Sequence, residues 1–146
     1  MREVVARGAA QARVEGGDHP VELVLPEELP LVRADPAQLE RVFANLIANA
    51  IRFSPTETPV RVSGGVGGGK VTVRVIDRGR GVPPSQRQRI FEPFFRGSEP
   101  GQGSGLGLAI CRGFVEANGG SIKYSRTGEE TSFTVAFPLV RQPVTA

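Results

Sequence analysis

Hydrophobic residues recur at helical spacing most clearly in the stretch PAQLERVFANLIANAIRF, residues 36–53. Apolar residues three and four positions apart lie on one side of an α-helix, so this pattern predicts a helix with one buried face. Asp35 and Pro36 are typical of an N-cap followed by the first helical residue, and Pro55 ends the segment. The predicted buried face consists of Leu39, Val42, Phe43, Leu46, Ile47 and Ala50.

Two further helices are predicted, over residues 3–14 and residues 105–118. The second follows a cluster of glycines and stops at Gly119 and Gly120, because glycine readily adopts the left-handed conformation that ends helices. Its predicted apolar stripe follows the spacing i, i+4, i+8 and i+11. The residues of this stripe are Leu106, Ile110, Phe114 and Ala117.

Alternating apolar and polar residues predict short strands between these helices. The expected strands cover residues 21–25, 60–62, 71–77, 121–126 and 131–139. The glycine-rich link Gly64–Gly69 is interpreted as a flexible hairpin turn. Strand pairs separated by single helices favour an α/β (α+β) two-layer sandwich, with a mixed sheet of about five strands and three main helices on one face.

Length and composition are typical of one globular domain, since 39% of the 146 residues are hydrophobic and 23% are charged. The net charge is +3, but no run of Lys and Arg with interleaved aromatics is present, so no nucleic-acid partner is expected. No apolar run approaches about 18 residues, so no membrane contact is expected, and the start lacks the layout of a signal peptide. The single cysteine, Cys111, excludes an internal disulfide and is interpreted as a packed thiol in a cytoplasmic protein.

A polar stripe runs along the helix at 36–53, beside its apolar face. At about 100° per residue, roughly one quarter of the circumference carries Arg41, Asn45, Asn49 and Arg52. Asparagine costs a helix about 0.5 kcal/mol relative to alanine, so two asparagines four positions apart suggest a functional role. An amide carbonyl is a hard oxygen donor suited to Mg²⁺, which usually shares phosphate oxygens and waters as well. A solvated helix edge is the alternative interpretation.

A lone acid, Asp77, stands at the end of the strand 71–77, in register with three valines on the face expected to meet the helices. A buried carboxylate is costly unless a donor binds it. It could accept a hydrogen bond from the exocyclic amine of adenine, whereas guanine presents a carbonyl there, and Gly79 and Gly81 would let the backbone approach the ring. The alternative is a turn-forming aspartate before Arg78 and Gly79.

The glycine cluster at residues 101–107 leads directly into a predicted helix and is suited to an anion. The amide hydrogens of a first helical turn have no partner, the helix dipole is positive there, and missing Cβ atoms let a phosphate come close.

Residues 82–104 show little periodicity and are interpreted as a lid over a site. The lid carries three phenylalanines, which either plug the core or form a patch for a partner. These are Phe91, Phe94 and Phe95. Arg96 follows them and could reach a terminal phosphate.

Four ordered motifs resemble the ATP-binding domain of sensor histidine kinases, part of a superfamily shared with gyrase-type ATPases and anti-sigma-factor kinases. In sequence order they resemble the N box, the first glycine box, the F box and the second glycine box. They are NLIANAIRFSP (45–55), DRGRG (77–81), FEPFFRG (91–97) and GSGLGLAI (103–110). The texture of residues 33–55 is also similar to the potassium-responsive subgroup of these kinases.

The resemblance implies a Bergerat-type fold that binds ATP and Mg²⁺ between the N-box helix and a mobile lid. It implies a leading helix and turn over residues 1–19, the catalytic domain over 20–140 with its lid at about 82–104, and a tail over 141–146.

The resemblance also implies roles for single residues. Asn49 is the implied metal ligand, and Asn45, Arg52 and Arg96 are the implied catalytic residues near the phosphates. The implied nucleotide-binding residues are Asn49, Phe53, Asp77, Gly79, Gly81, Gly103, Gly105, Leu106 and Gly107. This chain departs from the family at Arg52 and Phe53, where Lys and Tyr are more usual, and in the two arginines of DRGRG.

Such kinases pass the γ-phosphoryl group of ATP to a histidine on a separate helical hairpin. The single histidine here, His19, lies in GGDHPVEL and is interpreted as a surface turn residue, so the chain is expected to lack its own acceptor. The implied partners are the hairpin of the same full-length protein, expected to be membrane-anchored, and a response regulator. The alternatives are an anti-sigma-factor-type serine kinase, against which the F box argues, and a nucleotide-binding module without transfer activity. A gyrase-like ATPase is disfavoured because it would carry an acidic base in place of Asn45.

Overall fold

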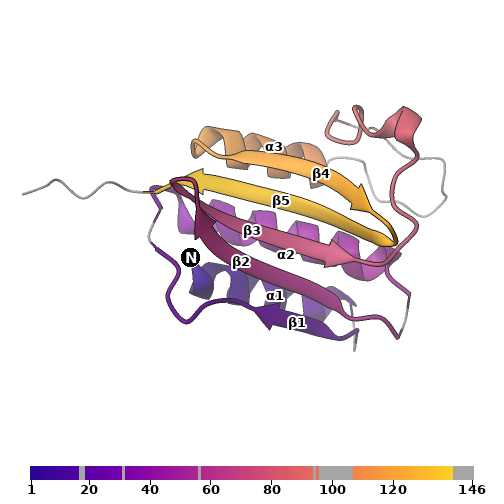
Figure 1. Cartoon of the computed structure of the whole chain (residues 1–146), viewed down its shortest axis with the longest axis horizontal. Helices are drawn as coiled ribbons and strands as arrows, with labels where there is room; N and C mark the ends of the chain where they lie inside the picture. The colour runs from indigo at the N-terminus through magenta and orange to yellow at the C-terminus, as the bar shows by residue number, and fades with distance from the viewer. Residues whose placement is uncertain (17–18, 31, 56, 94, 96–106, 140–146) are drawn as a thin grey trace, which may run out of the picture.

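The computed structural model describes residues 1–16, 19–30, 32–55, 57–93, 95 and 107–139. Within these residues the chain forms one five-stranded sheet with three α-helices on one face (Figure 1). This arrangement confirms the predicted two-layer α/β sandwich. In chain order its elements are α1 (Arg2–Gly16), β1 (Val21–Val24), α2 (Pro36–Phe53), β2 (Val60–Gly67), β3 (Lys70–Asp77), the 3₁₀ turn η1 (Pro84–Gln86), α3 (Gly107–Ala117), β4 (Ser121–Thr127) and β5 (Glu130–Pro138).

The sheet is mixed, with the strand order β1-β2-β3-β5-β4. β1 runs parallel to β2, and the other neighbouring strands are antiparallel. Because alternate residues of a strand point to the same face, the register aligns helix-facing side chains in rows across the sheet. The row at the end of β3 consists of Asp77, Thr131 on β5 and Arg126 on β4.

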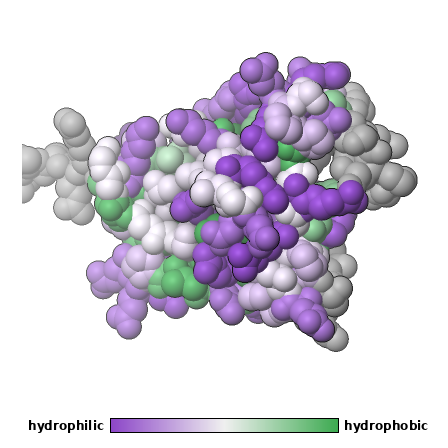
Figure 2. All heavy atoms as spheres, turned by 45° about the vertical axis from the view of Figure 1, so that its right-hand side comes forward, coloured by the Kyte–Doolittle hydropathy of each residue, from purple (hydrophilic) through white to green (hydrophobic). Residues whose placement is uncertain are grey.

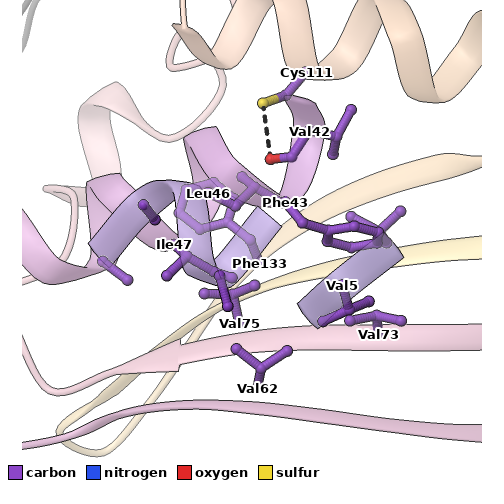
Figure 3. Close-up of a cluster of buried hydrophobic side chains, with 14 of the residues drawn as sticks. Val5, Val42, Phe43, Leu46, Ile47, Val62, Val73, Val75, Cys111 and Phe133 are labelled. Atoms are coloured by element: carbon purple, nitrogen blue, oxygen red, sulfur yellow. Dashed lines mark hydrogen bonds between the residues drawn. The ribbon is translucent and has the colours of Figure 1, made fainter. Parts of the chain in front are cut away.

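Helix α2 lies at the centre of the core and begins at the predicted cap. One carboxylate oxygen of Asp35 accepts hydrogen bonds from the backbone nitrogens of Ala37 at 2.9 Å and Gln38 at 3.2 Å, which satisfies donors that have no partner within the helix. All six residues of the predicted apolar face are buried, and Figure 3 shows several of them packed above the valines of the sheet. The periodicity therefore predicted both the extent and the orientation of this helix.

Helix α1 packs against α2 and buries Val5, Ala9 and Ala12 in the same core. Gly8 lies where the two helices meet: a Cβ there would stand 2.9 Å from Cβ of Phe43, so the close approach requires a residue without a side chain. None of the helices described in the structure is both long and apolar enough to cross a membrane.

The interpretation of Gly64–Gly69 as a flexible turn is wrong for most of its length. Strand β2 continues through Gly67, and only Gly68 and Gly69 form the turn, both with positive φ. Gly64 pairs with Val73 within the ladder, and a Cβ there would lie 2.9 Å from a side-chain carbon of Leu25. The glycine therefore makes room for a packed leucine.

The predicted apolar stripe of α3 is wrong at Ile110 and Ala117, whereas Phe114 packs against the core as predicted. Ile110 is 40% exposed and Ala117 is exposed, whereas Cys111 and Val115 are the buried residues of the helix. The segment is apolar on more than one side, so spacing alone could not select the face that packs. The small thiol of Cys111 allows close contact with α2. Leu106 lies outside the described residues.

Candidate nucleotide site

The acidic end of the site is built on Asp77, the last residue of β3. Its side chain is only 5% exposed, and its Oδ1 accepts a hydrogen bond from the backbone nitrogen of Gly79 at 2.7 Å. Burial raises the pKa of Asp77 above its ordinary value of 3.8, while the Gly79 hydrogen bond and the charge of Arg126 act in the opposite direction. Among the described residues, the hydrogen bonds to this carboxylate involve Oδ1 alone, so Oδ2 can accept from a ligand.

The turn after Asp77 touches the C-terminal end of α2. A Cβ on Gly79 would stand 2.3 Å from the carbonyl oxygen of Phe53, a distance that no side chain tolerates. Phe53 itself is 38% exposed, so it is not fully packed into the core. This contact brings the end of the N-box helix and the first glycine box together, as the resemblance implies.

The same turn rests on side chains from β4 and β5 that the sequence analysis missed. Arg126 donates through Nη1 to the carbonyl oxygen of Gly79 and, at 2.8 Å, to Oγ1 of Thr131. The hydroxyl of Tyr124 accepts from the backbone nitrogen of Val82 at 2.8 Å. Arg126 and Thr131 lie in the same row as Asp77, so the register of the last hairpin was the signal that could have identified them.

The surface around this end of the sheet is strongly hydrophilic, as Figure 2 shows. It carries two exposed ion pairs, Arg78–Glu129 at 3.6 Å and Arg61–Glu130 at 3.4 Å. Exposed pairs of this kind contribute little to stability. Arg78 lies on the surface beside the turn, and its ion pair directs its side chain to Glu129 in the β4–β5 hairpin.

Helix α3 runs antiparallel to α2. Near the start of α2, the side chain of Asn118 accepts from the backbone nitrogen of Asp35 at 2.8 Å. Further along, the Cys111 thiol donates to the carbonyl oxygen of Val42 at 3.6 Å (Figure 3). Gly107 begins α3 about 6 Å before Cys111 along the axis, so it lies toward Asn49 on α2.

The polar stripe of α2 lies at the edge of its buried face, as its spacing predicts. Asn45 and Asn49 are half-buried, whereas Arg41 and Arg52 are exposed. The structure therefore brings the asparagines near the first turn of α3, and Phe53 near the turn after Asp77. In the described part of the chain no cluster of three His, Cys, Asp or Glu side chains could hold a metal, so a metal here would need the asparagine amides and the ligand's own oxygens.

Cys111 is a packed thiol, as predicted, with no exposed surface. Burial raises the pKa of Cys111 to about 12, while Asn45 and Arg41 act in the opposite direction. We expect the thiol to resist alkylation by iodoacetamide at pH 8 in the folded protein, because almost no thiolate is present, and to react readily in denaturant. Mass spectrometry after timed labelling measures this, and rapid labelling of the folded protein would contradict the packing of α3 on α2.

The first part of the predicted lid packs onto the body of the domain. Arg87 donates to the carbonyl oxygen of Val82 at 3.0 Å and lies over the ring of Tyr124. Phe91 meets Phe133 edge-on, with ring centroids 6.1 Å apart, and both Phe91 and Phe95 pack against the core. The positions of Phe91 and Phe95 favour the interpretation that the phenylalanines plug the core over the interpretation that they form a patch for a partner.

Five positions named in the sequence analysis fall outside the described residues. They are Phe94, Arg96, Gly103, Gly105 and Leu106. Gly107 is described, and a Cβ placed on it meets no atom within 4 Å.

A mixed sheet covered by three helices, with a buried aspartate beside the end of an asparagine-bearing helix, is the architecture of a histidine-kinase-type ATP-binding domain. Residues 34–141 match the family of histidine kinase-, DNA gyrase B- and HSP90-like ATPases, and the chain belongs to this family.

Its relatives are sensor histidine kinases. The sensor protein KdpD of Escherichia coli strain K12 is 37% identical over 144 residues, which are 97% of this chain and 16% of that protein. The structure of the mycobacterial sensor histidine kinase MprB matches with a TM-score of 0.86 at 29% identity, covering 97% of both chains. Full-length ShkA in complex with AMPPNP matches with a TM-score of 0.74 at 30% identity, covering 98% of this chain and 30% of that one. The chain therefore spans about a sixth of the length of its KdpD relative.

Proposed function

We propose that this domain binds Mg-ATP and donates the γ-phosphoryl group to a histidine on a helical hairpin of the same full-length protein. The observation that carries the proposal is the buried Asp77, held by the Gly79 amide against the end of α2. A carboxylate buried beside a half-exposed phenylalanine can accept a hydrogen bond from the adenine amine while the ring packs on Phe53. Family membership and the likeness to kinases support the same function.

The phosphate end of the nucleotide is assigned to α2 and the start of α3. Asn49 would hold Mg²⁺ by its amide oxygen, with Asn45 and Arg52 beside it, and bound Mg²⁺ would neutralise charge on the phosphates. Gly107 and the glycines before it would present backbone amides to phosphate oxygens, and Arg96 would meet the γ-phosphate. The contribution of these residues is to position the phosphates and to complement their charge.

The accepting histidine is assigned to a segment outside this chain. His19 is half-buried, and its Nε2 lies 2.8 Å from the carbonyl oxygen of Thr58, so the ring is tied to the loop before β2. It sits on no helix, unlike a residue presented by a helical hairpin. A response regulator would receive the phosphoryl group afterwards. Because ATP is an intracellular ligand, we assign the domain to the cytoplasm. We propose that the full-length protein is anchored in the membrane.

Phosphorylation of a supplied acceptor tests this function. The protein is incubated with γ-labelled Mg-ATP and a separate hairpin fragment carrying the acceptor histidine, and the acid-labile label on histidine is measured. We expect label on the hairpin and none on the catalytic domain alone. Label on a serine of a protein antagonist would identify a switch kinase instead, and ATP binding without transfer to any acceptor would leave a nucleotide-binding module.

Replacing Asn49 by alanine tests the metal assignment. We expect Mg-ATP affinity to fall at least about tenfold, while affinity for ATP in EDTA changes little, because only the metal-bound form loses a ligand. Calorimetry with and without Mg²⁺ measures both affinities. Gln38→Ala is the control, since it removes an amide from the opposite end of the same helix, where Gln38 accepts a hydrogen bond from Asn118 at 2.8 Å; a loss of stability without a metal-dependent loss of affinity is expected there. Equal losses with and without metal would contradict the role of Asn49.

A further inference from the structure

The side chain of Arg126 reaches from β4 under the turn that follows Asp77. Its Nη1 donates to the carbonyl oxygen of Gly79 and to Oγ1 of Thr131, and the side chain is half-buried. The three side chains Asp77, Thr131 and Arg126 form one row across β3, β5 and β4 on the helix-covered face. A cation from the far strand is thus placed at the acidic end of the candidate site.

Gly79 is held through both of its peptide groups, the one before it and the one after it. Its nitrogen donates to Oδ1 of Asp77 at 2.7 Å, and its carbonyl oxygen accepts from Arg126. A glycine carries no side chain that could restrict the turn, so these two hydrogen bonds set the orientations of the two peptide groups that flank Gly79. Because the first bond also fixes the carboxylate, Arg126 acts on Asp77 through Gly79.

The next glycine of the turn is seated on the same side chains. Gly81 has a φ of 72°, and a Cβ there would stand 2.8 Å from the hydroxyl of Tyr124 and 3.0 Å from Nη1 of Arg126. The turn therefore lies directly on polar side chains of β4. Two hydrogen bonds anchor it there, one from Arg126 and one to Tyr124.

The charge of Arg126 favours the ionised form of Asp77, in which both carboxylate oxygens can only accept hydrogen bonds. Burial raises the pKa of Asp77, and the guanidinium of Arg126 opposes that effect.

We propose that Arg126 is a positioning residue for the adenine end of the nucleotide: by holding the Gly79 carbonyl against β4, it fixes the turn that orients Asp77. The inference rests on the proposed ATP-binding function. Arg126 is not assigned any contact with the nucleotide. Its effect should therefore appear in recognition of the base and not in binding of the phosphates.

The test compares the affinities of wild-type protein and Arg126→Met for Mg-ATP and Mg-GTP, measured by competition with a fluorescent adenine nucleotide. We expect Arg126→Met to weaken Mg-ATP binding by about tenfold or more, since hydrogen bonds from charged donors are the strong ones. Mg-GTP affinity should change by less than about twofold, because guanine presents a carbonyl to Asp77 at the position where adenine presents its amine. Arg126→Lys keeps the charge and one donor nitrogen, so it should recover part of the loss.

Arg74→Met is the matched control, since Arg74 lies on the opposite face of β3 and donates to Oγ of Ser132 at 3.3 Å. It should bind both nucleotides as the wild type does. Equal losses for ATP and GTP in Arg126→Met, or no loss, would overturn the inference. A wild-type protein that fails to bind Mg-ATP would instead contradict the proposed function itself.

A measurement on the wild type keeps the inference testable if Arg126→Met does not fold. The guanidinium NMR signals of Arg126 are followed during titration with each nucleotide. We expect them to shift with Mg-ATP and to shift less with Mg-GTP, because only adenine engages the Asp77–Gly79–Arg126 chain. Signals that respond equally to both nucleotides, or to neither at saturation with ATP, would overturn the positioning role.

Discussion

Asp77→Asn is expected to weaken Mg-ATP binding by about thirty- to a hundredfold, because the substituted amide can place a second donor against the adenine amine in a buried site. The same change should leave the domain at least as stable as the wild type. Since the folded state raises the pKa of Asp77, it binds the proton more tightly than the unfolded state does, and stability is lost as the pH rises through that raised value. Asparagine carries no charge and avoids this loss. Calorimetry and thermal unfolding at pH 7 measure the two effects.

Asp35→Asn is the matched control for this substitution. Asp35 is the N-cap at the other end of α2, and asparagine caps helices about as well as aspartate. We expect neither affinity nor stability to change in that variant. Binding that ignores both the Asp77 substitution and the replacement of ATP by GTP would refute the assignment of the adenine pocket. An Asp77→Asn protein that unfolds well below the wild type would show that the charged carboxylate stabilises the fold.

Gly79→Ala is expected to destabilise the domain by about 1–3 kcal/mol or more, because overpacking at a site bounded by backbone cannot be relieved by rotating a side chain. The added Cβ would stand 2.3 Å from the carbonyl oxygen of Phe53 and 2.9 Å from Oδ1 of Asp77. Either the end of α2 or the turn must move, so Mg-ATP affinity should fall as well. Urea unfolding at 25 °C gives the free energy of unfolding, and calorimetry gives the affinity.

Gly113→Ala is the control for the added methyl group. Gly113 lies inside α3, and a Cβ there meets nothing within 4 Å, so alanine should stabilise the helix by about 0.5–1 kcal/mol. A Gly79→Ala protein as stable as the wild type, with unchanged affinity, would disprove the close contact between α2 and the turn after Asp77.

The elements with one strong apolar face could be predicted from sequence. Helix α2 combines a cap, a strict 3.6-residue repeat and a proline stop, and all three lead to the same boundaries. The alternation of Val71, Val73 and Val75 placed Asp77 correctly on the covered face, because the two-residue period of a strand carries over to its last residue. The polar stripe beside the apolar face of α2 follows by the same geometry.

The remaining features depend on contacts between segments distant in sequence. Strand β2 needs Gly64 because Leu25, thirty-nine residues earlier, packs there, and no local pattern contains that requirement. The buried face of α3 is selected by α2, not by its own composition. Arg126 was missed because its contacts arise only when β4 and β5 pair beside β3, and a lone arginine before a turn resembles any solvated residue.

Helix α2 turns its hydrophobic side chains toward the sheet and carries both asparagines at the edge of that buried face. The same helix is thus central to the core and carries the asparagines of the proposed ligand site. A ligand that binds this helix in the folded protein stabilises the whole domain against unfolding. Conversely, a substitution that loosens the core around the helix should weaken ligand binding. Substitutions in this helix are therefore expected to change ligand affinity and the free energy of unfolding together.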